Sequence, residues 1–141
     1  MRTPSCVCIL LLAGCSSLPS SPPAGGSISG QIAYPSESTP DMRICAIAQE
    51  ATAHACTQAE AGAGSYRIAN LPAGNYVIVA QLHEGDMRVG GHTHQVQCIR
   101  APCPAQLQAV SVAPGAAVTG VDINEFYAAR DDFPSMPVDG D

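Results

Sequence analysis

Lysine is missing from this chain of 141 residues, and charge of any kind is scarce. All six cationic side chains are arginine, charged residues make up 13% of the sequence, and the formal net charge is −6. Nucleic-acid binding needs clustered cations that neutralise phosphates. We therefore expect no nucleic-acid partner for this anionic chain.

The sequence motifs of several enzyme classes are missing as well. There is no G-x-S-x-G, no H-E-x-x-H and no glycine-rich loop carrying lysine for phosphate. Serine and cysteine nucleophiles have no evident base and orienting partner. The sequence therefore predicts a protein that is not an enzyme and needs no cofactor.

No apolar run reaches the roughly 20 residues that a membrane-spanning helix needs. Residues 6–13 are apolar and follow Arg2, which is the pattern of a leader peptide. The run ends in Leu12-Ala13-Gly14-Cys15, which resembles the lipobox of bacterial lipoproteins. The resemblance implies that residues 1–14 are removed and that Cys15 carries diacylglycerol on its sulfur and an acyl chain on its new amino group. The alternative is an ordinary secretory leader with an incidental cysteine.

A lipid anchor would decide where the protein works. Aspartate after the anchor commonly marks inner-membrane retention in Gram-negative lipoproteins, whereas this chain has Ser16, so the resemblance implies the outer membrane, facing the periplasm. Residues 15–26 read CSSLPSSPPAGG, and their proline and serine content favours an extended, hydrated tether of about 3 Å per residue. We expect two partners: the membrane, through the anchor, and an envelope protein.

Four cysteines lie beyond the leader and the lipidated residue: Cys45, Cys56, Cys98 and Cys103. An even number in an exported chain indicates disulfides, although buried free thiols are the alternative. Three pairings are possible, and the short separations favour Cys45 with Cys56 and Cys98 with Cys103. The second bond would close residues 98–104, CIRAPCP, into a rigid loop that serves either as a structural clip or in recognition of a partner.

Alternation of apolar and polar residues predicts β-strands along most of the chain. In residues 26–34, GSISGQIAY, the side chains of Ile28, Ile32 and Tyr34 fall on one face. A helix through residues 49–61 is the alternative to one of the strands, because alanine, glutamine and glutamate favour helices. Further strands are predicted at residues 42–49, 53–58, 87–97, 106–112 and 118–127.

Two more strands flank a tight turn at Leu71-Pro72-Ala73-Gly74, in which we expect Gly74 to take a positive φ. The strand after the turn is apolar on both faces, with Ile78 on one face and Val77 and Val79 on the other, so we place it inside a sheet. About seven or eight short strands predict one all-β domain, an antiparallel β-sandwich over residues 27–127. Residues 128–141 are acidic and interrupted by proline, which predicts a disordered tail.

Residues 64–80, GSYRIANLPAGNYVIVA, resemble the signature G-x-Y-x-[LI]-x-x-L-P-x-G-x-Y-x-[VI]-x-A of carboxypeptidase regulatory-like domains. The resemblance covers residues 26–83 well and implies a transthyretin-like, or prealbumin-like, sandwich of the kind used as a stalk, spacer or binding platform. The usual acidic turn before the signature is replaced by Glu60-Ala61-Gly62-Ala63-Gly64. The related hydroxyisourate hydrolases end in a Tyr-Arg-Gly-Ser motif that this chain lacks, so no catalytic residue is carried over.

Histidines form the one polar group that could be a site. His92 and His94 would point the same way on a strand, and with His83 they could hold copper or zinc. The alternative, which we prefer, is a solvated hairpin rich in glycine. A zinc site shared with Cys98 and Cys103 has no familiar spacing.

These observations lead to one interpretation and two alternatives. We expect a non-catalytic cell-envelope lipoprotein that acts as a binding or spacer module on the periplasmic or outer surface. The first alternative is a periplasmic copper- or zinc-binding lipoprotein that uses His92 and His94. A transthyretin-like hydrolase ranks third.

Overall fold

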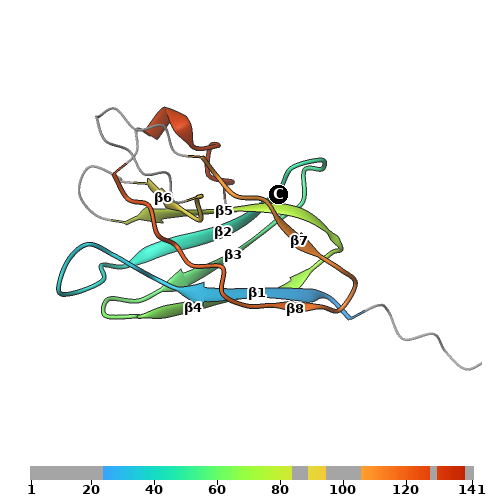
Figure 1. Cartoon of the computed structure of the whole chain (residues 1–141), viewed down its shortest axis with the longest axis horizontal. Coiled ribbons are helices and arrows are strands. Elements are labelled where there is room, and N and C mark those ends of the chain that lie inside the picture. Colours follow the sequence, from blue (N-terminus) through green and yellow to red (C-terminus); the bar gives the residue numbers. More distant parts are fainter. Residues whose placement is uncertain (1–23, 84–88, 95–105, 128–129, 139–141) are drawn as a thin grey trace, which may run out of the picture.

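The computed structural model describes residues 24–83, 89–94, 106–127 and 130–138 (Figure 1). These residues form eight strands and a 3₁₀ turn at Arg130–Asp132. No helix within these ranges is long and apolar enough to cross a membrane. The strands are β1 (Gly26–Gln31), β2 (Met42–Ala48), β3 (His54–Ala59), β4 (Ser65–Leu71), β5 (Gly74–Leu82), β6 (Val89–Gly91), β7 (Val110–Val112) and β8 (Ala117–Val118).

The strands form two sheets that face each other across one core (Figure 1). The smaller sheet has the order β4-β1-β8, and the larger has the order β3-β2-β5-β6, with β7 pairing with the start of β5. The predicted all-β sandwich is confirmed. One pairing departs from the antiparallel rule, because β8 and the residues after it follow β1 in the same direction. Val121 and Ile123 donate their N–H groups to the carbonyls of Ser29 and Gln31 along this path.

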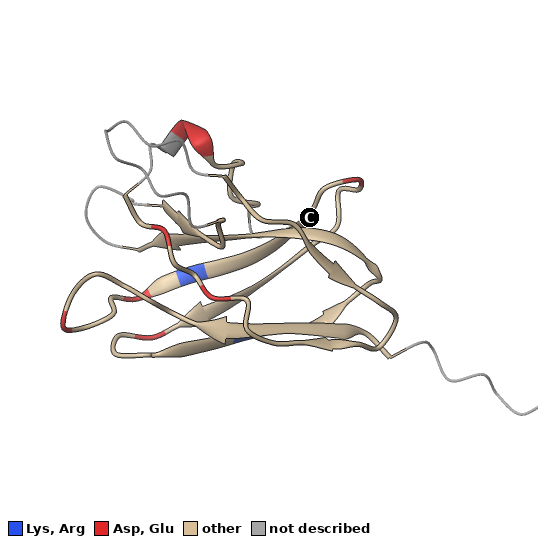
Figure 2. Cartoon of the chain, viewed as in Figure 1, with Lys and Arg blue, Asp and Glu red and all other residues tan. Residues whose placement is uncertain are grey.

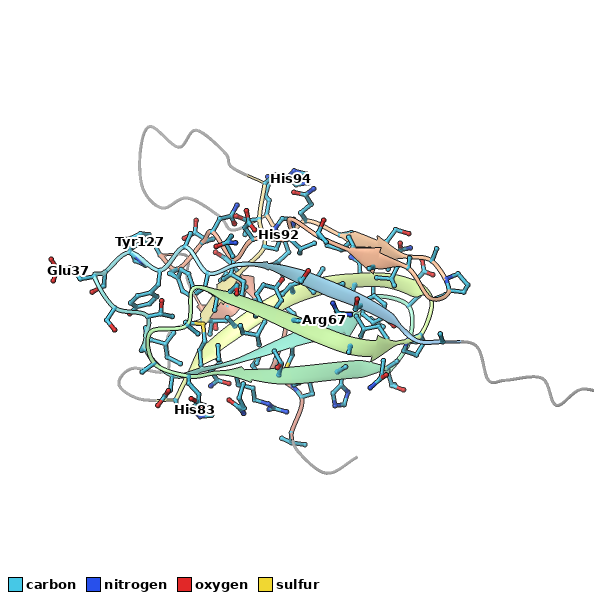
Figure 3. The ribbon with its side chains drawn as sticks, turned by 90° about the horizontal axis from the view of Figure 1, so that it is seen from below. Glu37, Arg67, His83, His92, His94 and Tyr127 are labelled. Atoms are coloured by element: carbon cyan, nitrogen blue, oxygen red, sulfur yellow. A yellow bond between two sulfur atoms is a disulfide. The ribbon has the colours of Figure 1, made fainter. Side chains whose placement is uncertain are left out.

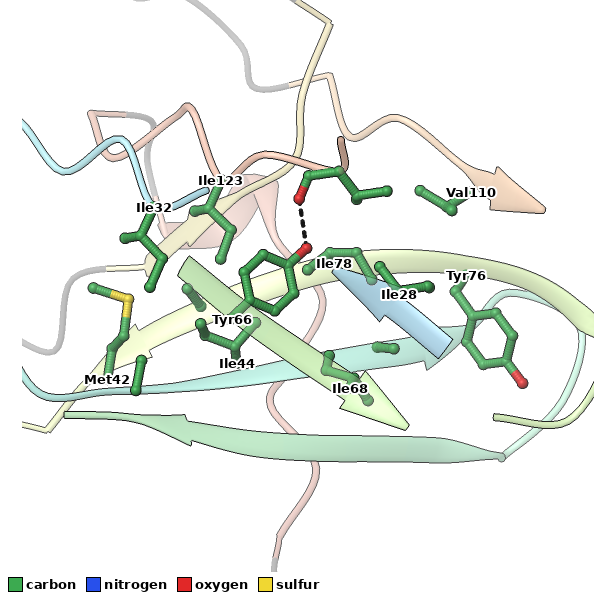
Figure 4. Close-up of a cluster of buried hydrophobic side chains, with 14 of the residues drawn as sticks. Ile28, Ile32, Met42, Ile44, Tyr66, Ile68, Tyr76, Ile78, Val110 and Ile123 are labelled. Atoms are coloured by element: carbon green, nitrogen blue, oxygen red, sulfur yellow. Dashed lines mark hydrogen bonds between the residues drawn. The ribbon is translucent and has the colours of Figure 1, made fainter. Parts of the chain in front are cut away.

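Side chains that alternate along the strands fill the space between the sheets (Figure 4). On β4, Tyr66 and Ile68 are buried while Arg67 points to solvent. The Tyr66 hydroxyl donates a 2.6 Å hydrogen bond to the carbonyl of Val121, which ties β4 to the segment beyond β8. Burial raises the pKa of Tyr66 far above its usual value, and the nearby charge of Asp122 raises it further.

The link between β4 and β5 is a corner between the two sheets and not a hairpin, because its flanking strands belong to different sheets. The Tyr76 hydroxyl donates a 2.7 Å hydrogen bond back to the carbonyl of Pro72 and holds the corner in place. The prediction of a positive φ at Gly74 is wrong. Asn70, with φ of 60°, takes the left-handed conformation instead, which asparagine tolerates better than most residues.

Strands β2 and β3 form a hairpin in which Cys45 lies directly opposite Cys56. A disulfide joins the two residues, whose Cα atoms are 4.1 Å apart, so this predicted pair is confirmed. The helical alternative for residues 49–61 is wrong, because pairing with β2 and the disulfide outweigh the helix-forming composition. Cys98 and Cys103 lie outside the described residues, as does Cys15.

Several predicted strands are shorter in the structure. β6 and β7 keep only part of residues 87–97 and 106–112, and β8 ends where the strand at residues 118–127 was expected to begin. Gly120, two residues beyond the end of β8, has a φ of 74°, which is outside the range of a strand. Pairing resumes afterwards only as single bridges, from Ile32 to Ile123 and from Gly91 to Glu125.

The C-terminal segment differs most from its prediction. The part of residues 128–141 that the structure describes was expected to be disordered, yet Phe133 is buried against Val79 and Val89 on the outer face of the larger sheet. Arg43 also donates a 2.6 Å hydrogen bond from Nη1 to the carbonyl of Pro137. The physical reason lies in β5, which is apolar on both faces and therefore needs a cover on its outer face.

Candidate functional site

The first candidate site is the extended segment that contains His92 and His94. Thr93 between them is buried, while His92 is half-buried and His94 is exposed, which is the alternation of a strand. The side chain of Asn124 holds Thr93 in place: its Oδ1 accepts the Thr93 N–H at 3.0 Å, and its Nδ2 donates to the Thr93 carbonyl at 3.1 Å. The side-chain amide of Asn124 thus pairs with the backbone of Thr93 as the backbone of a neighbouring strand would in a sheet.

His92 is fixed by a second contact. Its Nδ1 lies 2.7 Å from the carbonyl oxygen of Asp122. Because a carbonyl can only accept a hydrogen bond, Nδ1 carries the proton, and Nε2 of the neutral ring keeps its lone pair. Metal-binding histidines have the same arrangement, in which the ring nitrogen that does not bind the metal donates to an oxygen.

His83 does not join this pair. Its Nε2 lies 2.7 Å from Oε1 of Gln58 on β3, and Figure 3 shows it on the opposite side of the molecule from His94. Of the three predicted metal ligands, only His92 and His94 share one segment, with Thr93 between them. Within the part of the chain that the structure describes, no group of three or more histidine, cysteine or acidic side chains could hold a metal ion.

A second candidate site, absent from the sequence-based predictions, is a groove over the outer face of the smaller sheet. It has a volume of about 660 Å³ and lies between β4, β1 and the segment after β8. Polar and apolar atoms contribute about equally to its lining. The residues that line it are Ser29, Gly30, Gln31, Ser65, Tyr66, Arg67, Thr119, Gly120 and Asp122.

Two glycines and one carboxylate shape the groove. A Cβ on Gly30 would lie 2.0 Å from the carbonyl oxygen of Val121, so only glycine lets this segment approach β1 so closely. Gly120, just before this contact, has a φ of 74°, a conformation that favours glycine. Where the backbone pairing is interrupted, Oδ1 of Asp122 accepts the N–H of Gln31 at 2.8 Å, so that a side chain takes the place of a backbone acceptor.

The groove carries one charge of each sign. Arg67 on β4 is exposed and lies beside Ser29 in the strand register, and Asp122 lies on the far side of β1. Charges are sparse on this fold, and most of the acidic residues lie in loops at the end away from the start of β1 (Figure 2). The polar alternation of Ser29, Gln31 and Arg67 was a visible signal in the sequence. That Asp122 lies beside them depends on the parallel pairing of the last segment, which the sequence does not reveal.

In comparisons with known proteins, no family model, curated protein or solved structure matches the chain. The resemblance of residues 64–80 to carboxypeptidase regulatory-like domains therefore stays a prediction. What the structure establishes is the all-β sandwich and its disulfide.

Proposed function

We propose that the protein is a non-catalytic lipoprotein of the bacterial cell envelope, in which a lipid on Cys15 anchors a binding or spacer module to the periplasmic face of the outer membrane. The observation that carries the proposal is the disulfide between Cys45 and Cys56. Disulfides persist in oxidising compartments such as the periplasm. The tetrapeptide Leu12-Ala13-Gly14-Cys15 then supplies the means of anchoring after export.

The shape of the domain supports this role. The chain enters β1 at one end of the long axis, where the tether of residues 15–26 joins the sandwich (Figure 1). Glu37 and Tyr127 lie at the opposite end (Figure 3). A domain held at one end of its long axis presents the opposite end and the sheet faces to partners in the periplasm.

The anchor is tested by replacing Cys15. In the full chain expressed in a Gram-negative host, we expect Cys15→Ala to abolish incorporation of labelled palmitate, and mass spectrometry of the native chain to find a triacylated N-terminal Cys15. The matched control is Cys8→Ala in the leader, which should leave both results unchanged. An unmodified mature terminus in the native protein would overturn the proposal.

Metal binding is the second candidate function, and the Nδ1 contact of His92 to the Asp122 carbonyl favours it because it leaves Nε2 available. We expect Cu²⁺ or Zn²⁺ to bind more tightly than about 1 mM and the paired change His92→Ala with His94→Ala to remove that binding. His83→Ala is the control and should bind as the native chain does. Binding that persists without His92 and His94 would exclude this site.

A further inference from the structure

The groove over the smaller sheet contains two opposite charges that do not neutralise each other. Arg67 makes no hydrogen bond or ion pair with any other described residue, and it does not reach Asp122. The two residues stand on either side of β1, which lies between β4 and the segment of Asp122. Each charge is therefore available to a ligand.

Asp122 is held through one of its oxygens, while the other makes no hydrogen bond to the residues that the structure describes. Oδ1 accepts the backbone N–H of Gln31, and a carboxylate has further lone pairs on both oxygens. The backbone beneath is fixed by the close approach of Val121 to Gly30. The negative charge of Asp122 is therefore fixed in position. The positive charge of Arg67 lies at the end of a long, exposed side chain that can adjust to a ligand.

The surface between the two charges carries several polar groups and no further charged residue. The hydroxyls of Ser29, Ser65 and Thr119 and the amide of Gln31 offer both donors and acceptors. The groove as a whole has no formal net charge, although the chain carries −6. A ligand that matches it carries a negative group, a positive group and amides between them, which is the chemistry of a short peptide with free ends.

We propose that this groove binds a short zwitterionic peptide, with the peptide carboxylate at Arg67 and the peptide ammonium at Asp122. The inference rests on the proposed function, because it names the ligand of the binding module. Strands in a sheet are about 4.8 Å apart, so the backbones of Arg67 and Asp122 lie roughly 10 Å apart across β1. An extended tripeptide spans about the same distance.

Trialanine is the probe that tests this proposal, titrated into the lipidated full chain in detergent micelles by calorimetry. For an open groove with two charge-assisted contacts we expect a dissociation constant of about 1 mM. N-acetyl-trialanine and trialanine amide each lack one charge and should bind about tenfold more weakly. The affinity for trialanine should also fall as sodium chloride is raised.

Two variants assign each charge to its residue. Arg67→Gln should weaken trialanine about tenfold and remove the preference for a free carboxylate. Asp122→Asn keeps an oxygen for the Gln31 N–H, so the fold is retained, and it should remove the preference for a free ammonium. Glu37→Gln in the exposed loop at the far end is the matched control and should leave the affinity unchanged.

The contrary results are equally specific. The inference would be overturned if trialanine did not bind at a concentration of about 20 mM, which is 20-fold the expected dissociation constant. It would also be overturned if the two blocked peptides bound as tightly as trialanine, or if the uncharged trisaccharide maltotriose did. None of these results affects the Cys15→Ala experiment, so failure of the groove is distinguishable from failure of the anchored module.

Discussion

Phe133 covers Val79 on the face of the larger sheet that points away from the main core. Val79 is completely buried, yet its neighbours in the strand, Ile78 and Ala80, belong to the core between the sheets. The C-terminal segment thus forms a third layer over β5, and the folded unit includes residues beyond 127.

The first prediction concerns this third layer. Phe133→Ala should lower the free energy of unfolding by about 3 kcal/mol, because a buried aromatic ring is lost and Val79 is uncovered. Urea unfolding of the lipidated full chain in micelles, followed by circular dichroism, measures the change. Val138→Ala serves as the control, since that side chain is 74% exposed and its removal should change stability by less than about 0.5 kcal/mol. An unchanged midpoint for Phe133→Ala would show that the segment does not pack on the sheet.

The second prediction concerns the hairpin disulfide. Cys45→Ala combined with Cys56→Ala should destabilise the domain by about 3 kcal/mol, because the bond closes a short loop in the unfolded chain. Reduction with dithiothreitol should destabilise the native chain by a similar amount.

A variant with Cys98→Ala and Cys103→Ala keeps the first disulfide and isolates its contribution. In that background the reductant should still destabilise the domain. If reduction has no effect there, Cys45 and Cys56 are not joined in solution.

The third prediction follows from the buried tyrosines. Burial raises the pKa of Tyr66, with a further contribution from Asp122, and burial also raises the pKa of Tyr76. The unfolded chain therefore releases these protons at lower pH than the folded chain does. The stabilising contribution is complete below about pH 10 and is lost as the pH rises above that value.

Stability should thus be level up to about pH 10 and then fall by about 1.4 kcal/mol per pH unit for each tyrosine that stays protonated in the folded state. The sequence suits this measurement because it has no lysine to titrate in the same range. Tyr66→Phe should reduce the slope of stability against pH, and Tyr127→Phe, at an exposed position, should not.

Tyr66→Phe should also lower the free energy of unfolding by about 1–3 kcal/mol at pH 7, because the buried carbonyl of Val121 loses its hydrogen-bond donor. Identical slopes for native chain and Tyr66→Phe would contradict the assignment.

What the sequence could predict depends on the range of the physical signal. Strands β1, β2 and β4 follow from alternation within a few residues, and β5 follows from a short run that is apolar on both faces. The Cys45–Cys56 pair follows from a short separation. These features depend on neighbours in the sequence, so local patterns are sufficient. The positive φ at Asn70 was missed for a related reason: the turn residues were visible, but the crossing from one sheet to the other was not.

The groove and the third layer depend on segments that are distant in the sequence. Asp122 meets Gln31 only because the last segment runs parallel to β1, and no local pattern specifies that choice. Phe133 lies among polar and proline residues, which favoured disorder. The signal that pointed to it was on β5, where Val77 and Val79 made the outer face apolar and so required a cover.

The last prediction concerns the contact that shapes the groove. Gly30→Ala would place a Cβ 2.0 Å from the carbonyl oxygen of Val121, and this neighbour is backbone that cannot rotate away. The segment from Thr119 to Asp122 would have to move off β1, which should cost about 1–3 kcal/mol of stability. Gly64→Ala is the matched control, because a Cβ there has no atom within 4 Å and Gly64 does not have a positive φ. Thermal unfolding of both variants tests the contact, and nuclear magnetic resonance shifts of Gln31 and Asp122 should change in Gly30→Ala alone. Equal stability of the two variants would mean that the segment from Thr119 to Asp122 does not lie against β1. The groove would then not have the shape described.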